Sequence, residues 1–120
     1  MMRIAALLFL LSAAGWAGSW SGYLVDSGCY ADEQHNVNPT DTMPYIDRDM
    51  DLELRYCAPK AKTRHFAIVQ PDWSALAFDP AGNVKAAALM RTAGKKRYVP
   101  VEVTGQLDKR TIRVDSIAAR

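Results

Sequence analysis

Two cysteines, Cys29 and Cys57, restrict the possible folds of this chain more than any other feature of its 120 residues. A disulfide between them would close a loop of 29 residues. In the chain-entropy model, closing such a loop stabilises the folded state by about 3.6 kcal/mol before native strain is subtracted. Domains are stable by roughly 5 to 15 kcal/mol in total, so this one bond would supply a large share. The pairing requires an oxidising compartment.

The first 17 residues have the pattern of a secretory signal peptide. One basic residue, Arg3, precedes an apolar run that ends near Ala14, and a small residue suited to cleavage stands at Ala17. The run is shorter than the roughly 20 residues of a membrane-spanning helix. We therefore expect a signal peptide at 1–17, no stable membrane anchor after cleavage, and an exported protein that is periplasmic or extracellular. That location favours a structural disulfide between the two cysteines.

The remaining residues, 18–120, are enough for a single domain with one modest core. Charge is divided unequally along this domain. Residues 18–57 hold eight acids and two bases, a net of −6, whereas residues 58–120 hold twelve bases and five acids, a net of +7. The acidic part would either fold over a basic barrel surface or form a separate solvated face, and we favour the second arrangement because such fields are screened within about 8 Å.

Alternation of apolar residues and turn signals predict the order of the elements. Asn83 is the expected N-cap of a single helix, and Gly94 is its expected stop. Residues 30–56 are a long polar insertion between the cysteines, with a short helix near 50–56. Strands are predicted at 20–26, 64–70, 74–79, 97–105 and 111–117. A helix between the third and fourth of five strands is the order of an OB barrel, so we expect a mainly β, five-stranded OB-like barrel with one helix and a long acidic insertion after the first strand.

Three stretches also carry a resemblance to a known family: GYLVDSGC at 22–29, FDPAGNVKAAAL at 78–89 and VEVTGQLDKRTIRVDSI at 101–117. In these stretches the chain resembles a family of small secreted bacterial proteins of unknown function with an OB-like barrel. The resemblance extends from Trp20 to Ile117, nearly the whole mature chain. It implies the fold and no chemistry. The chain departs from the pattern at PDW (71–73) and DKR (108–110), where such proteins usually have Asp-Gly turns.

A metal site is the main alternative to a structural disulfide. Cys29, His35 and Cys57 are soft or borderline ligands for zinc or copper, and Met43 or Met50 would add a thioether ligand for copper. Their spacing matches neither C-x-x-C nor H-x-x-x-H. The alternative function is therefore a periplasmic copper-binding, zinc-binding or thiol-active protein that uses the two cysteines and the histidine.

The sequence contains no recognisable catalytic constellation. Asp26 and Ser27 are neighbours on a strand and point to opposite faces, and no G-x-S-x-G motif is present. The acids from Asp47 onward do not form a calcium loop, because Leu52 and Ala58 occupy the positions that require Gly and Glu. We expect no enzymatic activity and no cofactor.

Exposed aromatic rings among bases are the usual polymer-binding groups of an OB barrel. The candidates here are Trp20, Tyr23, Trp73, Tyr98, Arg64, Lys85 and Arg113. The two rings at 20 and 23 point to opposite faces of one strand, so one of them is expected in the core. Export and the acidic insertion argue against nucleic acid. The expected protein is a non-catalytic, disulfide-linked exported module whose partner is an envelope polysaccharide or a protein.

Overall fold

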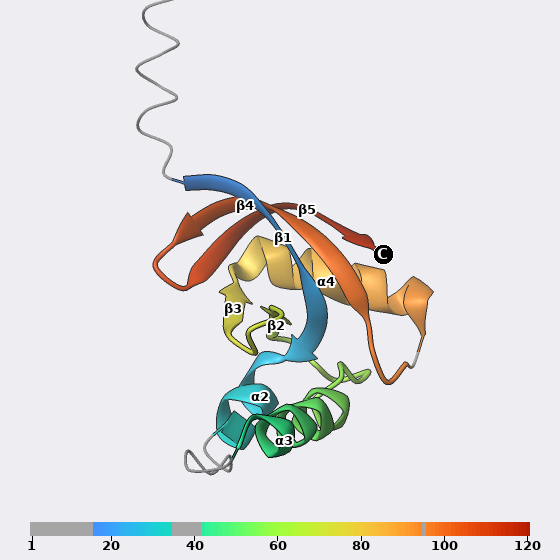
Figure 1. Cartoon of the computed structure of the whole chain (residues 1–120). Helices are drawn as coiled ribbons and strands as arrows, with labels where there is room; N and C mark the ends of the chain where they lie inside the picture. Colours follow the sequence, from blue (N-terminus) through green and yellow to red (C-terminus); the bar gives the residue numbers. More distant parts are fainter. Residues whose placement is uncertain (1–15, 35–41, 95) are drawn as a thin grey trace, which may run out of the picture.

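A computed structural model describes residues 16–34, 42–94 and 96–120. The predicted signal peptide, except for its last two residues, and His35 lie outside the described residues. The described part contains five strands and three helices (Figure 1). In chain order these are β1 (Trp16–Asp26), α2 (Ser27–Gln34), α3 (Met43–Tyr56), β2 (Phe66–Val69), β3 (Ala75–Phe78), α4 (Pro80–Ala93), β4 (Pro100–Asp108) and β5 (Thr111–Ala119).

The five strands close into a barrel in the order β1-β2-β3-β5-β4. The first strand closes it by pairing with β4 from Trp16 to Tyr23 and with β2 from Tyr23 to Asp26. β3 pairs with β5 in parallel, and the other pairs are antiparallel. The prediction of a mainly β, five-stranded barrel is confirmed.

Two glycines permit this closure. A Cβ at Gly22 would lie 2.1 Å from the carbonyl oxygen of Val69, at the point where β1 passes from β4 to β2. A Cβ at Gly105 would lie 2.1 Å from the carbonyl oxygen of Arg113, beside the irregularity in the register of β4 and β5. Both strands therefore approach their neighbours more closely than a side chain would allow.

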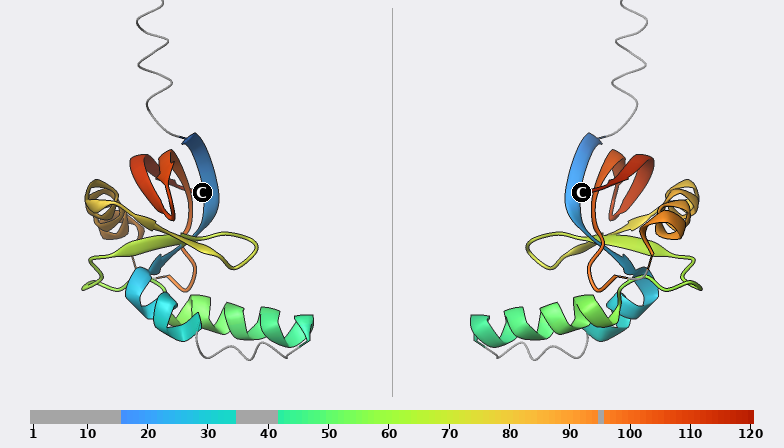
Figure 2. Two further views of the ribbon diagram at one scale, coloured as in Figure 1. Left: turned by 90° about the vertical axis from the view of Figure 1, so that its left-hand side faces the viewer. Right: turned by 90° about the vertical axis from the view of Figure 1, so that its right-hand side faces the viewer.

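The inside of the barrel is filled by a buried apolar core, and helices cover part of its outer face. The side chains of β2 alternate, so Phe66 and Ile68 join the interior core, whereas Ala67 and Val69 join a second core on the outer face. The helices α2 and α3 cover this outer face, and they lie side by side against one another (Figures 1 and 2). Their contributions to the outer core are Tyr30, Met50, Leu54 and Cys57.

The expectation of a single barrel helix and a largely irregular insertion is therefore wrong, although the short helix predicted near 50–56 is present as the second half of α3. α3 runs over most of the predicted polar segment, because Ile46, Met50 and Leu54 recur every fourth residue and pack on the barrel. α2 begins directly after β1, where the carboxylate of Asp26 accepts a hydrogen bond from the backbone N–H of Cys29 at 3.1 Å. No helix of the described residues is long and apolar enough to cross a membrane.

The helix α4 also begins earlier than predicted. Its N-cap is Asp79, which accepts a hydrogen bond from the backbone N–H of Gly82 at 2.9 Å. The predicted cap, Asn83, instead accepts from the backbone N–H of Phe66 at 2.9 Å and so ties the helix to β2. The predicted stop at Gly94 is confirmed, with a φ of 72° that favours glycine.

Candidate functional site

The predicted disulfide is present. Cys29 of α2 and Cys57, the C-cap of α3, are bonded, with their Cα atoms 5.5 Å apart. Only 1% of Cys57 is exposed. In this oxidised form neither sulfur is a thiolate, and His35, the third ligand of the alternative metal site, lies outside the described residues. Within the described ranges no three His, Cys, Asp or Glu side chains are grouped to hold a metal ion.

The segment that follows the disulfide, residues 58–65, is a basic loop fixed at both ends. The backbone N–H of Asp26 donates to the carbonyl oxygen of Cys57 at 2.8 Å, and the backbone N–H of Ser27 donates to the carbonyl oxygen of His65 at 2.9 Å. In the middle, the buried hydroxyl of Thr63 donates to the carboxylate of Asp26 at 2.9 Å and accepts from the backbone N–H of Lys60 at 2.9 Å. The end of β1 thus holds the loop in a defined conformation.

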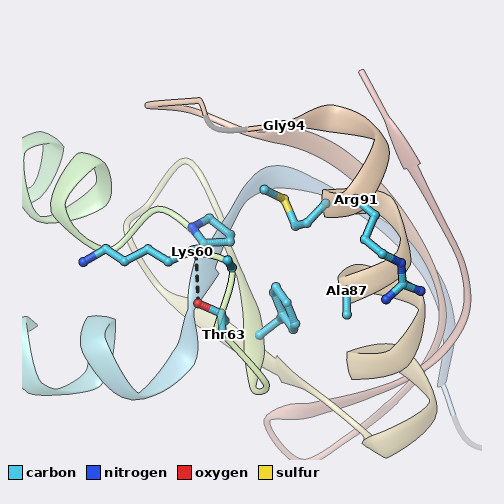
Figure 3. A pocket seen from close by; sticks show the side chains of 9 residues that line it. Lys60, Thr63, Ala87, Arg91 and Gly94 are labelled. Carbon is cyan, nitrogen blue, oxygen red and sulfur yellow. Dashed lines mark hydrogen bonds between the residues drawn. The ribbon is translucent and has the colours of Figure 1, made fainter.

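This loop forms one wall of a hollow of about 300 Å³ whose other wall is α4 (Figure 3). Figure 3 shows Lys60 on one side of the hollow and Arg91 on the other, with apolar side chains between them. The apolar lining comprises Pro59, Ala61, Phe66, Ala87 and Met90. A second hollow of about 630 Å³ shares Pro59, Lys60 and Ala61 with the first. The two hollows therefore adjoin at residues 59–61 of the loop.

We call these two hollows together the basic groove. Among the residues that the structure describes, no acid lines the basic groove. Six described cations line it: Arg55, Lys60, Lys62, Arg91, Lys96 and Arg97. Among the described residues only Arg55 of these six is ion-paired, with 3.4 Å between its Nε and Oδ2 of Asp51. The ammonium of Lys60 lies 5.4 Å from the ring centre of Tyr56. Five of the six cations are therefore available to an anionic ligand.

The basic surface continues past the groove. A further hollow of about 530 Å³ is lined by Lys62, Arg64 and His65 together with the acid Asp26 and the start of α2. Lys62 belongs to both hollows. Positive charge consequently follows the loop from the end of α3 to the beginning of β2.

The predicted aromatic residues separate into two groups. Trp20 packs against the interior core, as expected for one of the two rings on β1. Tyr23 is 40% exposed, and its ring centre lies 5.5 Å from that of Tyr98. Tyr23 and Trp73 line a hollow of about 330 Å³, which we call the aromatic hollow. Its remaining lining residues are Ser21, Gly22, Val69, Gln70, Pro71, Pro100 and Arg120. The predicted bases Arg64, Lys85 and Arg113 do not line it.

Carboxylates of α3 hold two of these rings. The indole N–H of Trp73 donates to Asp47 at 3.1 Å, and the hydroxyl of Tyr98 donates to Asp51 at 2.7 Å. The second bond raises the pKa of the Tyr98 phenol. Asp47 and Asp51 are one helical turn apart, so they dock one side of α3 on the barrel. The acidic insertion thus packs on the outer face of the barrel, and its acids do not line the basic groove.

One acid of α3 is buried without full compensation. Glu53 is 8% exposed, and its Oε2 accepts no hydrogen bond within the described part of the chain. Burial raises the pKa of this carboxyl, and the nearby Glu33 and Asp49 raise it further. The side chain is therefore a source of instability for the two helices at neutral pH.

The basic groove was not among the sites predicted from the sequence. Its residues come from two stretches of the chain, 55–66 and 87–97, which the fold brings together. The available signal was the concentration of bases in PKAKTRH and GKKR. Comparisons with protein-family models, curated proteins and solved structures found no match.

Proposed function

We propose that the protein is an exported, non-catalytic OB-like binding module that holds an acidic polysaccharide in the basic groove. The observation that carries the proposal is the set of six cations around two adjoining hollows, which no acid of the described residues lines. A groove lined by one sign of charge concentrates ligands of the opposite sign. Carboxylates along a sugar chain would pair with the lysines and arginines of the rim, and the apolar floor would contact the sugar rings.

The strand order supports the OB-like assignment. The barrel closes as β1-β2-β3-β5-β4, and α4 joins β3 to β4. OB barrels commonly bind polymers over the outer face of their second and third strands. Here the residues on that face, Ala67, Val69 and Ala75, pack in the outer core beneath α2 and α3. The ligand therefore needs another surface, and the basic groove lies beside this covered face.

Two features favour a polysaccharide over nucleic acid. The N-terminal residues predict export, which removes the protein from the cell's nucleic acids. The disulfide between Cys29 and Cys57 fits the oxidising environment in which envelope polysaccharides are found.

Isothermal titration calorimetry would test the proposal. The protein is expressed with its own N-terminus, purified without reductant, and titrated with oligogalacturonate, with a neutral oligosaccharide of equal length and with an oligonucleotide. We expect binding of the oligogalacturonate that weakens as salt increases, and no binding of the neutral sugar. Tighter binding of the oligonucleotide, or absence of binding to all acidic oligosaccharides, would overturn the proposal.

A matched pair of triple variants locates the site. K60Q/K96Q/R97Q removes three cations of the groove, and K85Q/K109Q/R113Q removes three exposed bases that line none of the hollows described above. Exposed ion pairs contribute roughly 0.5 kcal/mol each, and about 1.4 kcal/mol changes an affinity tenfold. The first variant should therefore bind about tenfold more weakly, while the second should retain most of the affinity. Equal losses in both variants would mean that charge acts without a site.

A further inference from the structure

We infer that the ligand extends beyond the basic groove into the aromatic hollow, where Tyr23 and Trp73 receive one sugar ring that carries a carboxylate. This inference depends on the proposed function, because it names a second subsite for the same polysaccharide. It is carried by the position of the aromatic hollow, by the composition of its lining and by the contacts that connect it to the groove.

A continuous set of contacts connects the basic groove with the aromatic hollow. Arg55 lines the groove and pairs with Asp51 at 3.4 Å. Asp51 accepts the hydroxyl hydrogen of Tyr98 at 2.7 Å, and the ring of Tyr98 lies 5.5 Å from that of Tyr23 in the aromatic hollow. The chain itself makes the same connection, since residues 96 and 97 line the groove and Pro100 lines the hollow.

The aromatic hollow has the composition of a sugar site. Pyranose rings present an apolar face that packs on aromatic side chains, and their hydroxyls require nearby hydrogen-bonding groups. The hollow offers the rings of Tyr23 and Trp73 and the polar side chains of Ser21 and Gln70. A guanidinium from Arg120, exposed and without an ion pair among the described residues, would pair with a carboxylate. These groups together fit a uronic acid unit.

The position of Trp73 supports a role for its ring. This residue has a φ of 70°, a backbone conformation that residues other than glycine rarely adopt. Asp47 holds the indole nitrogen at 3.1 Å, so the ring is fixed before a ligand arrives. Asp47 and Asp51 are both engaged, by Trp73 in one case and by Arg55 and Tyr98 in the other, which limits their repulsion of an acidic sugar.

The experiment uses oligogalacturonates of increasing length, starting from the disaccharide. Wild-type affinity should rise in a step once the oligomer is long enough to reach from the basic groove into the aromatic hollow. Tryptophan fluorescence, to which both Trp20 and Trp73 contribute, should change only at or above that length. Y23A should lose the step, with long oligomers binding about fivefold or more weakly, and should bind the disaccharide as the wild type does. Y23L, which keeps the bulk of the side chain, should behave like Y23A.

The control is Y45A, because Tyr45 is an exposed tyrosine of α3 (53%) that lines neither hollow. It should keep the full length dependence. If K60Q/K96Q/R97Q weakens binding while Y23A and Y23L retain the step, the second subsite is wrong and the groove stands. If the groove variant also binds normally, the proposed function itself fails. A loss in Y23A that is equal for the disaccharide and for long oligomers would also overturn the second subsite.

Discussion

Removal of the disulfide should loosen the two covering helices and leave most of the barrel folded. The perturbation is C29S/C57A, which replaces the half-buried cysteine with a polar residue and the buried one with an apolar residue of similar size. The double variant leaves no free thiol that would form bonds between molecules. Any loss of stability can then be assigned to the missing cross-link.

The magnitude follows from the position of the bond. The cysteines are separated by 28 positions, so the cross-link contributes about 3.6 kcal/mol at most in the chain-entropy model and about 3 kcal/mol after typical strain. For a domain near this size, 1 kcal/mol changes the melting temperature by roughly 4 to 8 °C. The melting temperature should therefore fall by about 15 °C.

The loss should also be local. Cys57 belongs to the outer core with Tyr30, Met50 and Leu54, whereas the interior core contains neither cysteine. Hydrogen exchange followed by mass spectrometry should show faster exchange in α2 and α3, with β4 and β5 still protected. Wild-type protein treated with reductant provides the control and should behave like the variant.

The reasoning would be refuted by an unchanged melting temperature, which would mean that the cross-link stabilises nothing. It would equally be refuted if exchange in β4 and β5 increased as much as in the helices, since the two cores would then unfold as one unit.

Three further predictions concern single residues. Because Glu53 binds its proton more tightly in the folded chain, the free energy of unfolding should fall as pH rises from the ordinary pKa of 4.5 through the raised value. E53Q should therefore increase the melting temperature at pH 7 and leave it unchanged at pH 4. The exposed control D115N should show no such difference between the two pH values. D79A should lower the free energy of unfolding by about 2 kcal/mol in urea titrations. The substitution removes the carboxylate that caps α4 and that also accepts a hydrogen bond from the backbone N–H of Val114 in β5. G22A should prevent closure of the barrel, as its Cβ would lie 2.1 Å from a carbonyl oxygen, whereas G28A meets only an ordinary contact of 3.7 Å and should fold normally, as judged by circular dichroism.

The barrel and its cross-link are predictable from the sequence because their signals are local or covalent. Strand alternation, the stop at Gly94 and an even pair of cysteines each act over a few residues or through one bond. Only the second half of the covering helix α3 was predicted, as a short helix near 50–56, because the carboxylates of α3 dilute its apolar pattern. Two of those carboxylates, Asp47 and Asp51, bond to rings on the barrel, and such long-range partners leave no trace in local periodicity.

The start of α4 was misassigned for a related reason. Both Asp79 and Asn83 suit an N-cap, but Asp79 also accepts the backbone N–H of Val114 at 3.1 Å. Asn83 accepts from Phe66 instead. Tertiary contacts with β5 and β2 therefore decided between two equivalent local signals. The basic groove was unpredictable as a site for the same reason, since only the folded chain brings its two walls, at 55–66 and 87–97, together.

The separation of charge along the sequence acquires a physical meaning in the folded chain. The acidic half supplies the helices that cover the outer core and uses two of its carboxylates to hold Trp73 and Tyr98. The basic half begins directly after the disulfide, and its first loop forms a wall of the groove. The cross-link thus fixes the acidic cover on one side and the start of the basic loop on the other. The polyanion that we propose as ligand would be repelled from the covered face and attracted to the groove beside it. In that proposal the single bond between Cys29 and Cys57 contributes both to the stability of the cover and to the position of the binding site.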